Sequence, residues 1–185
     1  MRIIAGTYGG RSIKTGEGPG YRPATGKVRG AVFSMLEARG LVWSGLRALD
    51  VFAGSGSLGI EALSRGADLA WFLEKDARAA ALIADNLKAL GVQPGRFRVL
   101  RKDALSVLSR PPERPFGLAF VDPPYGQGLL APALDNLARK QWMEEGGLVL
   151  AESEAALPPL RPEGLELLTD RLYGQTRITL WSIKR

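Results

Sequence analysis

Short apolar segments alternate with helical patterns along most of this chain. Five segments have the nearly continuous apolar character of strands that are buried on both faces, namely 46–52, 69–74, 97–101, 118–122 and 147–153. Four others carry apolar residues at three- and four-residue spacing, which is typical of helices, namely 58–65, 77–90, 104–109 and 129–141. This alternation predicts a doubly wound α/β fold, in which helices cover both faces of a mostly parallel sheet.

The two ends of the chain depart from this alternation. Residues 3–15 read as two short strands around Gly9 and Gly10, which predicts a β-hairpin, and residues 16–21 form a loop rich in glycine and proline. A helix is expected from Thr25, whose hydroxyl can serve as the N-cap. Near the other end, two strands over 165–172 and 176–183 predict an antiparallel pair. We therefore expect a basic arm, 1–24, followed by one domain, 25–185.

The composition excludes several kinds of chemistry. The 185 residues include no histidine and no cysteine, so the commonest metal ligand, the commonest general base and any thiolate nucleophile are missing. Carboxylates, backbone groups and a cofactor must therefore carry any reaction, and we expect no metal. The sequence contains neither a signal-peptide pattern nor an apolar run of about 18 residues, so we expect a cytoplasmic protein without a membrane span.

The net charge of +6 is concentrated near the N-terminus. Residues 1–30 hold six basic residues against a single acid, Glu17, whereas the rest of the chain is nearly neutral. A basic arm of this kind favours a polyanionic partner such as RNA, although a solvated basic surface without a partner explains the same pattern equally well. The six basic residues are Arg2, Arg11, Lys14, Arg22, Lys27 and Arg29.

A carboxylate, two prolines and an aromatic residue follow the fourth predicted strand, at Asp122, Pro123, Pro124 and Tyr125. The prolines remove two backbone donors and stiffen the turn. The Asp122 carboxylate and the Pro123 carbonyl can only accept hydrogen bonds, and Tyr125 offers a flat stacking face. This combination fits a planar group with an exocyclic amine, such as a nucleobase. The simpler alternative is a rigid strand exit in which the aspartate caps the loop.

A glycine-rich turn joins the first predicted parallel strand to its helix. Gly54, Gly56 and Gly59 match the pattern G-x-G-x-x-G in the strand–turn–helix context that this pattern requires. Glu74 ends the next strand, and a carboxylate about 20 residues after the glycines can accept hydrogen bonds from ribose hydroxyls. These features together predict a nucleotide-type ligand at the carboxyl edge of the sheet.

Two classes of ligand fit this turn. A dinucleotide places its pyrophosphate at the helix N-terminus, whereas S-adenosylmethionine has no phosphate and carries an ammonium and a sulfonium. Asp50 and Asp122 both end strands at this edge, and the additional acid favours the cationic ligand. Asp103 can accept from an adenine amine or can simply cap the following helix. An NAD-dependent oxidoreductase is the alternative, but it leaves 122–125 and the basic arm unexplained.

These motifs resemble those of class I S-adenosylmethionine-dependent methyltransferases. More closely, the chain resembles the bacterial family that methylates the exocyclic N2 of one guanine in 16S ribosomal RNA. The resemblance implies a seven-stranded, mostly parallel Rossmann-like sheet with a C-terminal antiparallel strand pair and an N-terminal β-hairpin extension. The segments that carry it are 2–6 with 10–11, 22–25 with 28–29, 33–36, 52–56 with 58–67, 121–125 and 152–153.

The resemblance also implies roles for individual residues. A pocket for S-adenosylmethionine would be formed by Arg22, Thr25, Asp50, Phe52, Gly54, Gly56, Glu74, Lys75, Asp103, Ala104 and Asp122. The guanine would be received by Asp122, Pro123, Pro124 and Tyr125, and the RNA would contact Arg2, Arg11, Lys14, Lys27 and Arg29. Gly26 and Gly30 stand where the family pattern leads us to expect charged residues, which weakens the transfer of contacts around Lys27 and Arg29.

The implied substrate is 16S ribosomal RNA within an assembled or assembling 30S particle, and the implied enzyme is a monomer. A methyltransferase that acts on adenine N6 in RNA or DNA is the nearest alternative, because the segment 122–125 also suits that amine. DNA enzymes of this kind usually carry an added target-recognition region, for which this chain has little room. A non-catalytic RNA-binding module is a third alternative, against which the intact Asp122 and glycine turn argue. A cytosine C5 methyltransferase is excluded because it needs a cysteine nucleophile.

Overall fold

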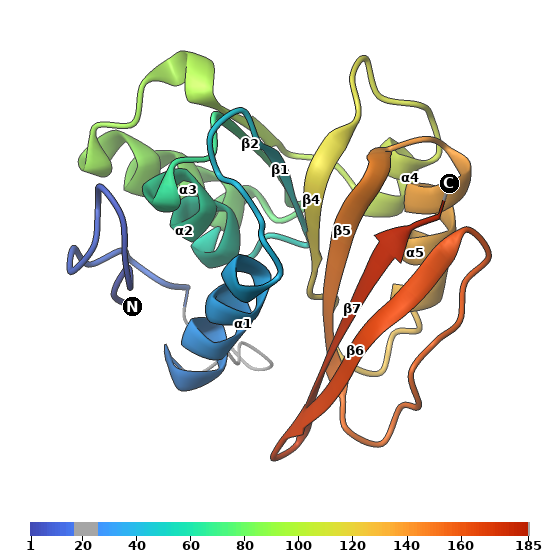
Figure 1. Cartoon of the computed structure of the whole chain (residues 1–185). Helices are drawn as coiled ribbons and strands as arrows, with labels where there is room; N and C mark the ends of the chain where they lie inside the picture. Colours follow the sequence, from blue (N-terminus) through green and yellow to red (C-terminus); the bar gives the residue numbers. More distant parts are fainter. Residues whose placement is uncertain (17–25, 185) are drawn as a thin grey trace.

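The computed structural model describes residues 1–16 and 26–184 (Figure 1). Within these residues, seven strands form one sheet in the order β3-β2-β1-β4-β5-β7-β6. Strands β1 to β5 pair in parallel, whereas β7 runs antiparallel to both β5 and β6. The bounds are β1 (Arg47–Val51), β2 (Leu69–Leu73), β3 (Phe97–Leu100), β4 (Phe116–Val121), β5 (Met143–Glu154), β6 (Leu165–Tyr173) and β7 (Thr176–Ile183).

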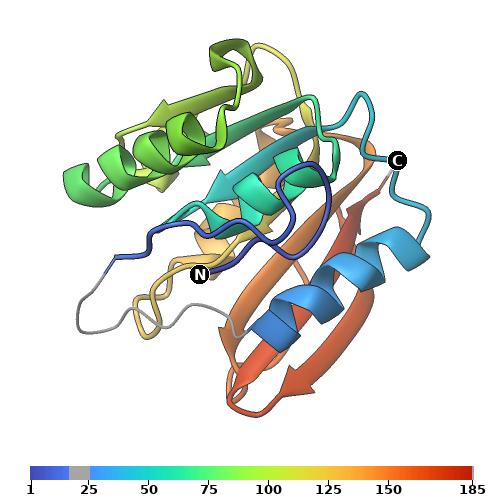
Figure 2. The same cartoon turned by 90° about the vertical axis from the view of Figure 1, so that its left-hand side faces the viewer.

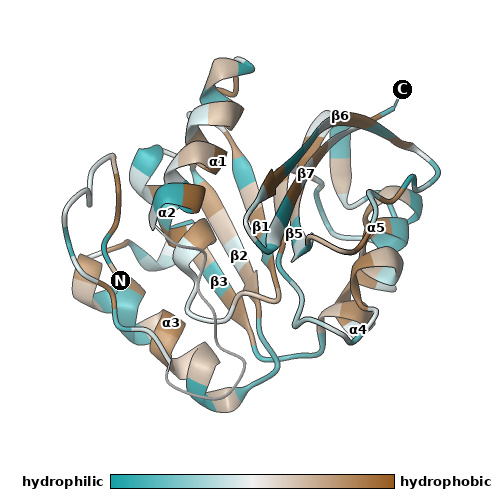
Figure 3. Cartoon of the chain, turned by 90° about the horizontal axis from the view of Figure 1, so that it is seen from below, coloured by the Kyte–Doolittle hydropathy of each residue, from teal (hydrophilic) through white to brown (hydrophobic). Residues whose placement is uncertain are grey.

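Helices cover both faces of the sheet, as the view in Figure 3 shows. Helices α1, α2 and α3 pack on one face around a buried cluster that includes Phe33, Ile60 and Ile83, and α4 and α5 pack on the other face around Leu108 and Leu134. No helix in the described part of the chain is both long and apolar enough to cross a membrane. The bounds are α1 (Gly26–Ala38), α2 (Ser57–Arg65), α3 (Ala77–Leu90), α4 (Ala104–Leu108) and α5 (Leu130–Arg139).

The predicted fold class is confirmed, with two local differences in the parallel part of the sheet. Strand β5 begins at Met143 rather than near Gly147, and its register with β4 shifts between Phe116 and Leu118. This first part of the strand was not predicted because residues 144–146, which are polar or glycine, interrupt the apolar pattern. A short 3₁₀ turn, η1 (Pro94–Arg96), also precedes β3 and was not predicted.

The N-terminal arm, defined as residues 1–16, is paired only at its base. Arg2 bridges Ser12, and the Ile3 amide donates to the Arg11 carbonyl at 2.9 Å. The intervening residues form a wider loop than the tight turn expected around Gly9 and Gly10, because this loop packs on α2. Figure 2 shows the arm lying across that helix.

The arm belongs to the main core of the protein. Ile3, Tyr8 and Ile13 are buried in the same apolar cluster as residues of α2 and α3. Such burial stabilises the arm against the domain rather than leaving it as a free appendage. The boundary proposed at residue 24 lies outside the described residues and stays a prediction.

Candidate functional site

The predicted site residues meet at one edge of the sheet because the parallel strands end in register. Val51 pairs with Leu73 on one side and with Val121 on the other, and Val121 pairs in turn with Ala151. The residues that follow these positions therefore lie side by side at the carboxyl edge, where open α/β sheets bind ligands. They are Phe52, Glu74 and Asp122, which were predicted, and Glu152, which lies within β5 and was not.

Asp50 lies in the interior beneath the glycine turn. Its side chain is almost fully buried, and its Oδ2 accepts a hydrogen bond of 2.9 Å from the Gly59 amide. A Cβ on Gly59 would lie 2.4 Å from Cε1 of Phe72, so only glycine allows α2 to approach so closely. The pKa of Asp50 is raised to about 8, mainly by burial and additionally by the charge of Glu74, while the hydrogen bond from Gly59 acts in the opposite direction.

Glu74 holds the glycine turn from the neighbouring strand. Its Oε2 accepts from the Gly54 amide at 2.8 Å, and its Oε1 accepts from the Asp76 amide at 2.7 Å. Phe52 has a φ of +62° and Gly54 a φ of +54°. Positive φ is unusual for a residue with a side chain, and such conformations gather at functional sites. The carboxylate that was predicted to hold ribose therefore also fixes the backbone of the turn.

Asp103 caps α4. Its Oδ1 accepts a hydrogen bond of 2.8 Å from the Ser106 amide, which is the simpler of the two roles considered from the sequence. Ala104 is buried at the first position of that helix, whereas Lys75 is exposed after β2. An adenine contact at Asp103 stays a prediction.

The segment Asp122–Tyr125 is anchored by the last strands of the sheet. The Tyr125 hydroxyl lies 3.4 Å from Oε1 of Glu152, at the end of β5, and 3.4 Å from the Thr176 hydroxyl, at the start of β7. The Gly126 amide donates to Oε1 of Glu154 at 2.7 Å. Tyr125 keeps 41% of its surface exposed, so its ring remains available for stacking.

Acidic groups at this edge are held in conditions that disfavour their ionisation. Burial raises the pKa of Asp122 well above its usual value, and the charges of Glu152 and Asp50 raise it further. Burial likewise raises the pKa of Glu152, while hydrogen bonds from Tyr125 and Thr176 partly offset this effect. No cluster of three or more acidic side chains in 1–16 and 26–184 is arranged to hold a metal ion.

This electrostatic setting tests the predicted cofactor. Buried carboxyls at the ends of β1, β4 and β5 would repel a pyrophosphate and would be stabilised as carboxylates by a nearby cation. The residues present therefore fit a ligand that carries an ammonium and a sulfonium. Arg22 and Thr25, which were also predicted to contact the cofactor, lie outside the described residues.

Three site residues were not among the sequence predictions. Glu152, Glu154 and Thr176 anchor the segment 122–126, but they come from strands that lie far along the chain. The sequence signal that could have found Glu152 is a polar residue directly after the apolar run of 147–151, as for Asp122 after β4.

The predicted RNA-contacting residues divide into two groups. Arg2, Lys14 and Lys27 are exposed, as an RNA contact requires. Arg11 donates from Nη1 and Nη2 to the carbonyls of Leu90 and Ala89, at 2.9 and 2.6 Å, and so caps the C-terminus of α3. This cap gives Arg11 a structural role beside its predicted one.

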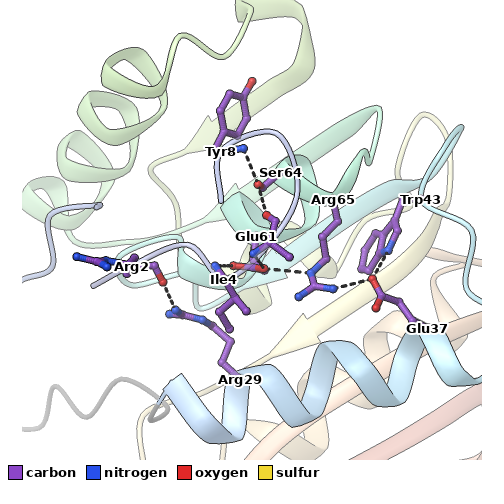
Figure 4. Close-up of polar contacts among 10 residues, drawn as sticks. Arg2, Ile4, Tyr8, Arg29, Glu37, Trp43, Glu61, Ser64 and Arg65 are labelled. Atoms are coloured by element: carbon purple, nitrogen blue, oxygen red, sulfur yellow. Dashed lines mark hydrogen bonds and ion pairs between the residues drawn. The ribbon is translucent and has the colours of Figure 1, made fainter. Parts of the chain in front are cut away.

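Arg29 requires a correction. Its side chain is buried, with 3% of the residue exposed, and its guanidinium donates to the Arg2 carbonyl (Figure 4). A buried guanidinium that binds the arm is not offered to a partner at the surface. We therefore remove Arg29 from the predicted RNA-contacting set.

Nearly the whole chain matches a known protein family. The family model described as "Conserved hypothetical protein 95" matches residues 1–182. The chain belongs to this family. Together with the relatives that follow, this match confirms the resemblance at the level of the family.

Relatives and solved structures agree with this membership. Ribosomal RNA small subunit methyltransferase D of Escherichia coli is 36% identical over 183 residues, which cover 98% of this chain and 89% of the relative. The protein of the same name from Haemophilus influenzae is 34% identical over 175 residues, which cover 94% and 89%. The solved structure of the E. coli protein yhhF has a TM-score of 0.87 at 35% identity and covers 100% of this chain and 98% of its own.

Proposed function

We propose that this protein transfers a methyl group from S-adenosylmethionine to the exocyclic N2 of a guanine in 16S ribosomal RNA during assembly of the small ribosomal subunit. The observation that carries the proposal is the adjacency of β1 and β4. Their register brings the glycine turn after Val51 and the acceptor segment after Val121 to one edge of the sheet. A methyl donor and an amine acceptor bound at these two places would meet between the strands.

The cofactor side of the site would be formed by the first two strands. Asp50 and Glu74 would provide acidic partners for the amino-acid and ribose portions, and Gly54 and Gly56 would allow close backbone approach. When bound, S-adenosylmethionine supplies a methyl group on a cationic sulfur. A buried carboxyl such as Asp50 gains a favourable partner from that cation, which offsets part of its desolvation.

The acceptor side would orient the amine of the base. Asp122 and the Pro123 carbonyl would accept the two N–H bonds of guanine N2, and Tyr125 would stack on the ring. These hydrogen bonds favour a pyramidal nitrogen, whose lone pair then points out of the base plane toward the methyl group. Holding the two reactants in line can supply roughly 7–11 kcal/mol of the barrier reduction.

The proton balance needs no strong base before the transfer. The nitrogen–carbon bond forms as the carbon–sulfur bond breaks, with the electron pair returning to sulfur. The amine becomes acidic once it carries the methyl group, so a proton then leaves nitrogen for the carboxylate form of Asp122, which binding of the cationic cofactor would favour. The raised pKa of that carboxyl suits it to receive a proton.

The choice of RNA and of guanine rests on the family. Relatives more than 30% identical, among them those of E. coli and H. influenzae, carry the name ribosomal RNA small subunit methyltransferase D. The exposed basic residues Arg2, Lys14 and Lys27 suit a phosphate backbone. A base must leave its stack to reach Asp122, which costs a few kcal/mol and is least costly in a loop.

Transfer of a labelled methyl group tests the proposal. Purified protein and labelled S-adenosylmethionine would be incubated with small-subunit particles that lack the modification, with free 16S RNA and with duplex DNA. We expect label in the particles or in the free RNA. Label only in DNA, or binding of NAD without binding of S-adenosylmethionine in calorimetry, would contradict the proposal.

A further inference from the structure

The N-terminal arm is fixed to α2 by two buried polar side chains (Figure 4). Glu61 accepts hydrogen bonds from the Ile4 amide at 2.8 Å and from the Ala5 amide at 3.1 Å. Ser64, one turn later, accepts from the Tyr8 amide at 3.0 Å, and its own carbonyl accepts from the Thr7 amide at 2.7 Å. The contact of the arm with α2 is therefore made largely through the backbone of the arm.

Both anchoring residues are almost completely buried. Glu61 and Ser64 each expose 1% of their surface. A Cβ on Gly6 would lie 1.8 Å from the Ser64 carbonyl oxygen, so the arm approaches the helix as closely as backbone permits. A buried carboxylate needs full pairing, and the backbone amides of the arm contribute to it.

Helix α2 joins the arm to the cofactor side of the site. Its N-cap is Gly56, and its third residue, Gly59, donates to Asp50 beneath the glycine turn. Glu61 follows two residues later. A helix of nine residues thus carries the glycine turn at one end and the arm along its side, so the arm has a fixed position relative to the site.

Arg65 extends this network away from the arm. Its Nε donates to Oε1 of Glu61 at 3.0 Å, and its Nη1 donates to Oε1 of Glu37 at 2.6 Å. Glu37 is half exposed and also accepts from the Trp43 indole at 3.0 Å. The two glutamates therefore share one arginine, but it is Glu61 that accepts the hydrogen bonds of the arm.

We propose that Glu61 is a positioning residue for RNA binding. By holding the Ile4 and Ala5 amides, it fixes the arm on α2 as a preformed RNA-docking surface, and it sets the affinity for RNA without contacting the RNA. This inference rests on the proposed function, because it takes RNA as the substrate.

The surface that the arm presents fits such a role. Arg2 is exposed and Ile4 is exposed by 41%, so the arm presents a cationic and an apolar side chain two residues apart along the anchored backbone. Lys14 is also exposed, and its backbone amide and carbonyl pair with the side chain of Asn86 at 2.9 and 2.8 Å. A surface fixed in advance binds RNA with a smaller loss of conformational entropy than a free arm would.

The variant Glu61→Gln tests the inference, with Glu37→Gln as its matched control. A glutamine keeps the shape but offers one acceptor oxygen and an NH2 group, so one amide of the arm is left without its acceptor. Glu37→Gln makes the same change at the other partner of Arg65, away from the arm. The measurements are KM and kcat with RNA, the salt dependence of RNA binding, the affinity for S-adenosylmethionine by calorimetry, and hydrogen exchange at Ile4 and Ala5.

We expect Glu61→Gln to raise KM for RNA about tenfold, which corresponds to about 1.4 kcal/mol. Its kcat and its cofactor affinity should stay within about twofold of the parent, while exchange at Ile4 and Ala5 accelerates. The salt dependence of RNA binding should weaken, because a loosened arm neutralises fewer phosphates. Glu37→Gln should match the parent in all of these measurements.

An unchanged KM in a variant whose arm amides exchange faster would overturn the inference. An equal loss of RNA and cofactor affinity in both variants would also overturn it, since that pattern indicates general destabilisation. If Glu61→Gln does not fold, Ser64→Ala removes the acceptor of the Tyr8 amide and provides the same comparison. Failure of the parent protein to methylate RNA would instead contradict the proposed function.

Discussion

Replacing Asp50 with asparagine removes a buried ionisable group beneath the glycine turn while nearly preserving its shape. The amide oxygen of asparagine can still accept the hydrogen bond that Asp50 receives from the Gly59 amide. The substitution therefore isolates the effect of the carboxyl's proton from the effect of its packing. When no cofactor is bound, we expect the stability of the variant relative to the parent to increase as the pH rises from about 4 to about 8 and to stay constant above that.

The magnitude follows from the raised pKa of Asp50. Folding raises this pKa from 3.8 to about 8, so the folded protein binds the proton more tightly than the unfolded chain does. The parent accordingly loses stability as the pH rises from about 4 to about 8, by at most about 1.36 kcal/mol per pH unit. The full loss has an upper limit of roughly 6 kcal/mol, and relaxation around a buried charge reduces it.

Urea unfolding of the parent and of Asp50→Asn between about pH 5 and about pH 8.5 measures this difference. The gap in unfolding free energy should widen in favour of the variant by about 1 kcal/mol per pH unit up to about pH 7.5. Asp122 and Glu152 also have raised pKa values, but they are present in both proteins, so the gap reports mainly on Asp50. If the unfolding free energies of the two proteins changed with pH in parallel, the reasoning would be refuted, because Asp50 would then take up no proton on folding.

Three further sets of substitutions test the site and the basic surface. Asp122→Asn should lower kcat by on the order of 10²–10³ while the affinity for S-adenosylmethionine, measured by calorimetry, is unchanged; near-normal turnover would exclude Asp122 from the chemistry. Tyr125→Ala should weaken binding of the target base by about 1–3 kcal/mol, whereas Tyr125→Phe should bind it normally, since stacking needs only the ring; equal RNA affinity in both variants would argue against stacking. Neutralising Arg2 and Lys27 should reduce the salt slope of RNA binding by about one for each phosphate that is no longer neutralised; an unchanged slope would remove them from the interface.

The location of the site was predictable because it depends on where strands end. Each apolar run that leads to Asp50, Glu74 and Asp122 marks a buried parallel strand, and parallel strands end at a common edge. The prediction needed no knowledge of side-chain contacts. The observed register, in which Val51 is level with both Leu73 and Val121, agrees with it.

The partners of these residues were not predictable in the same way. Glu152 reaches Tyr125 because β5 pairs with β4, and Thr176 reaches it because β7 pairs with β5. Both pairings are long-range features of the sheet. Glu61 lies on an amphipathic helix where a polar residue ordinarily faces solvent, and its burial comes from an arm 57 residues away in sequence. Local sequence patterns do not predict such long-range contacts.

The charge of residues 1–30 overstates the exposed basic surface for a related reason. The sequence shows how many arginines the N-terminal region holds, but it does not show which of them are used within the fold. Arg11 caps α3, and Arg29 is buried against the Arg2 carbonyl. The basic surface available to RNA is therefore smaller than the charge of residues 1–30 suggested.

The most direct test of the proposed activity is the identity of the methylated atom. Small-subunit RNA methylated by this protein would be digested to nucleosides, and the labelled product would be compared with standards by chromatography and mass spectrometry. We predict N2-methylguanosine as the labelled nucleoside, from one position in 16S RNA. Label in N6-methyladenosine would contradict the assignment to guanine, and label in no RNA nucleoside would contradict the proposed activity.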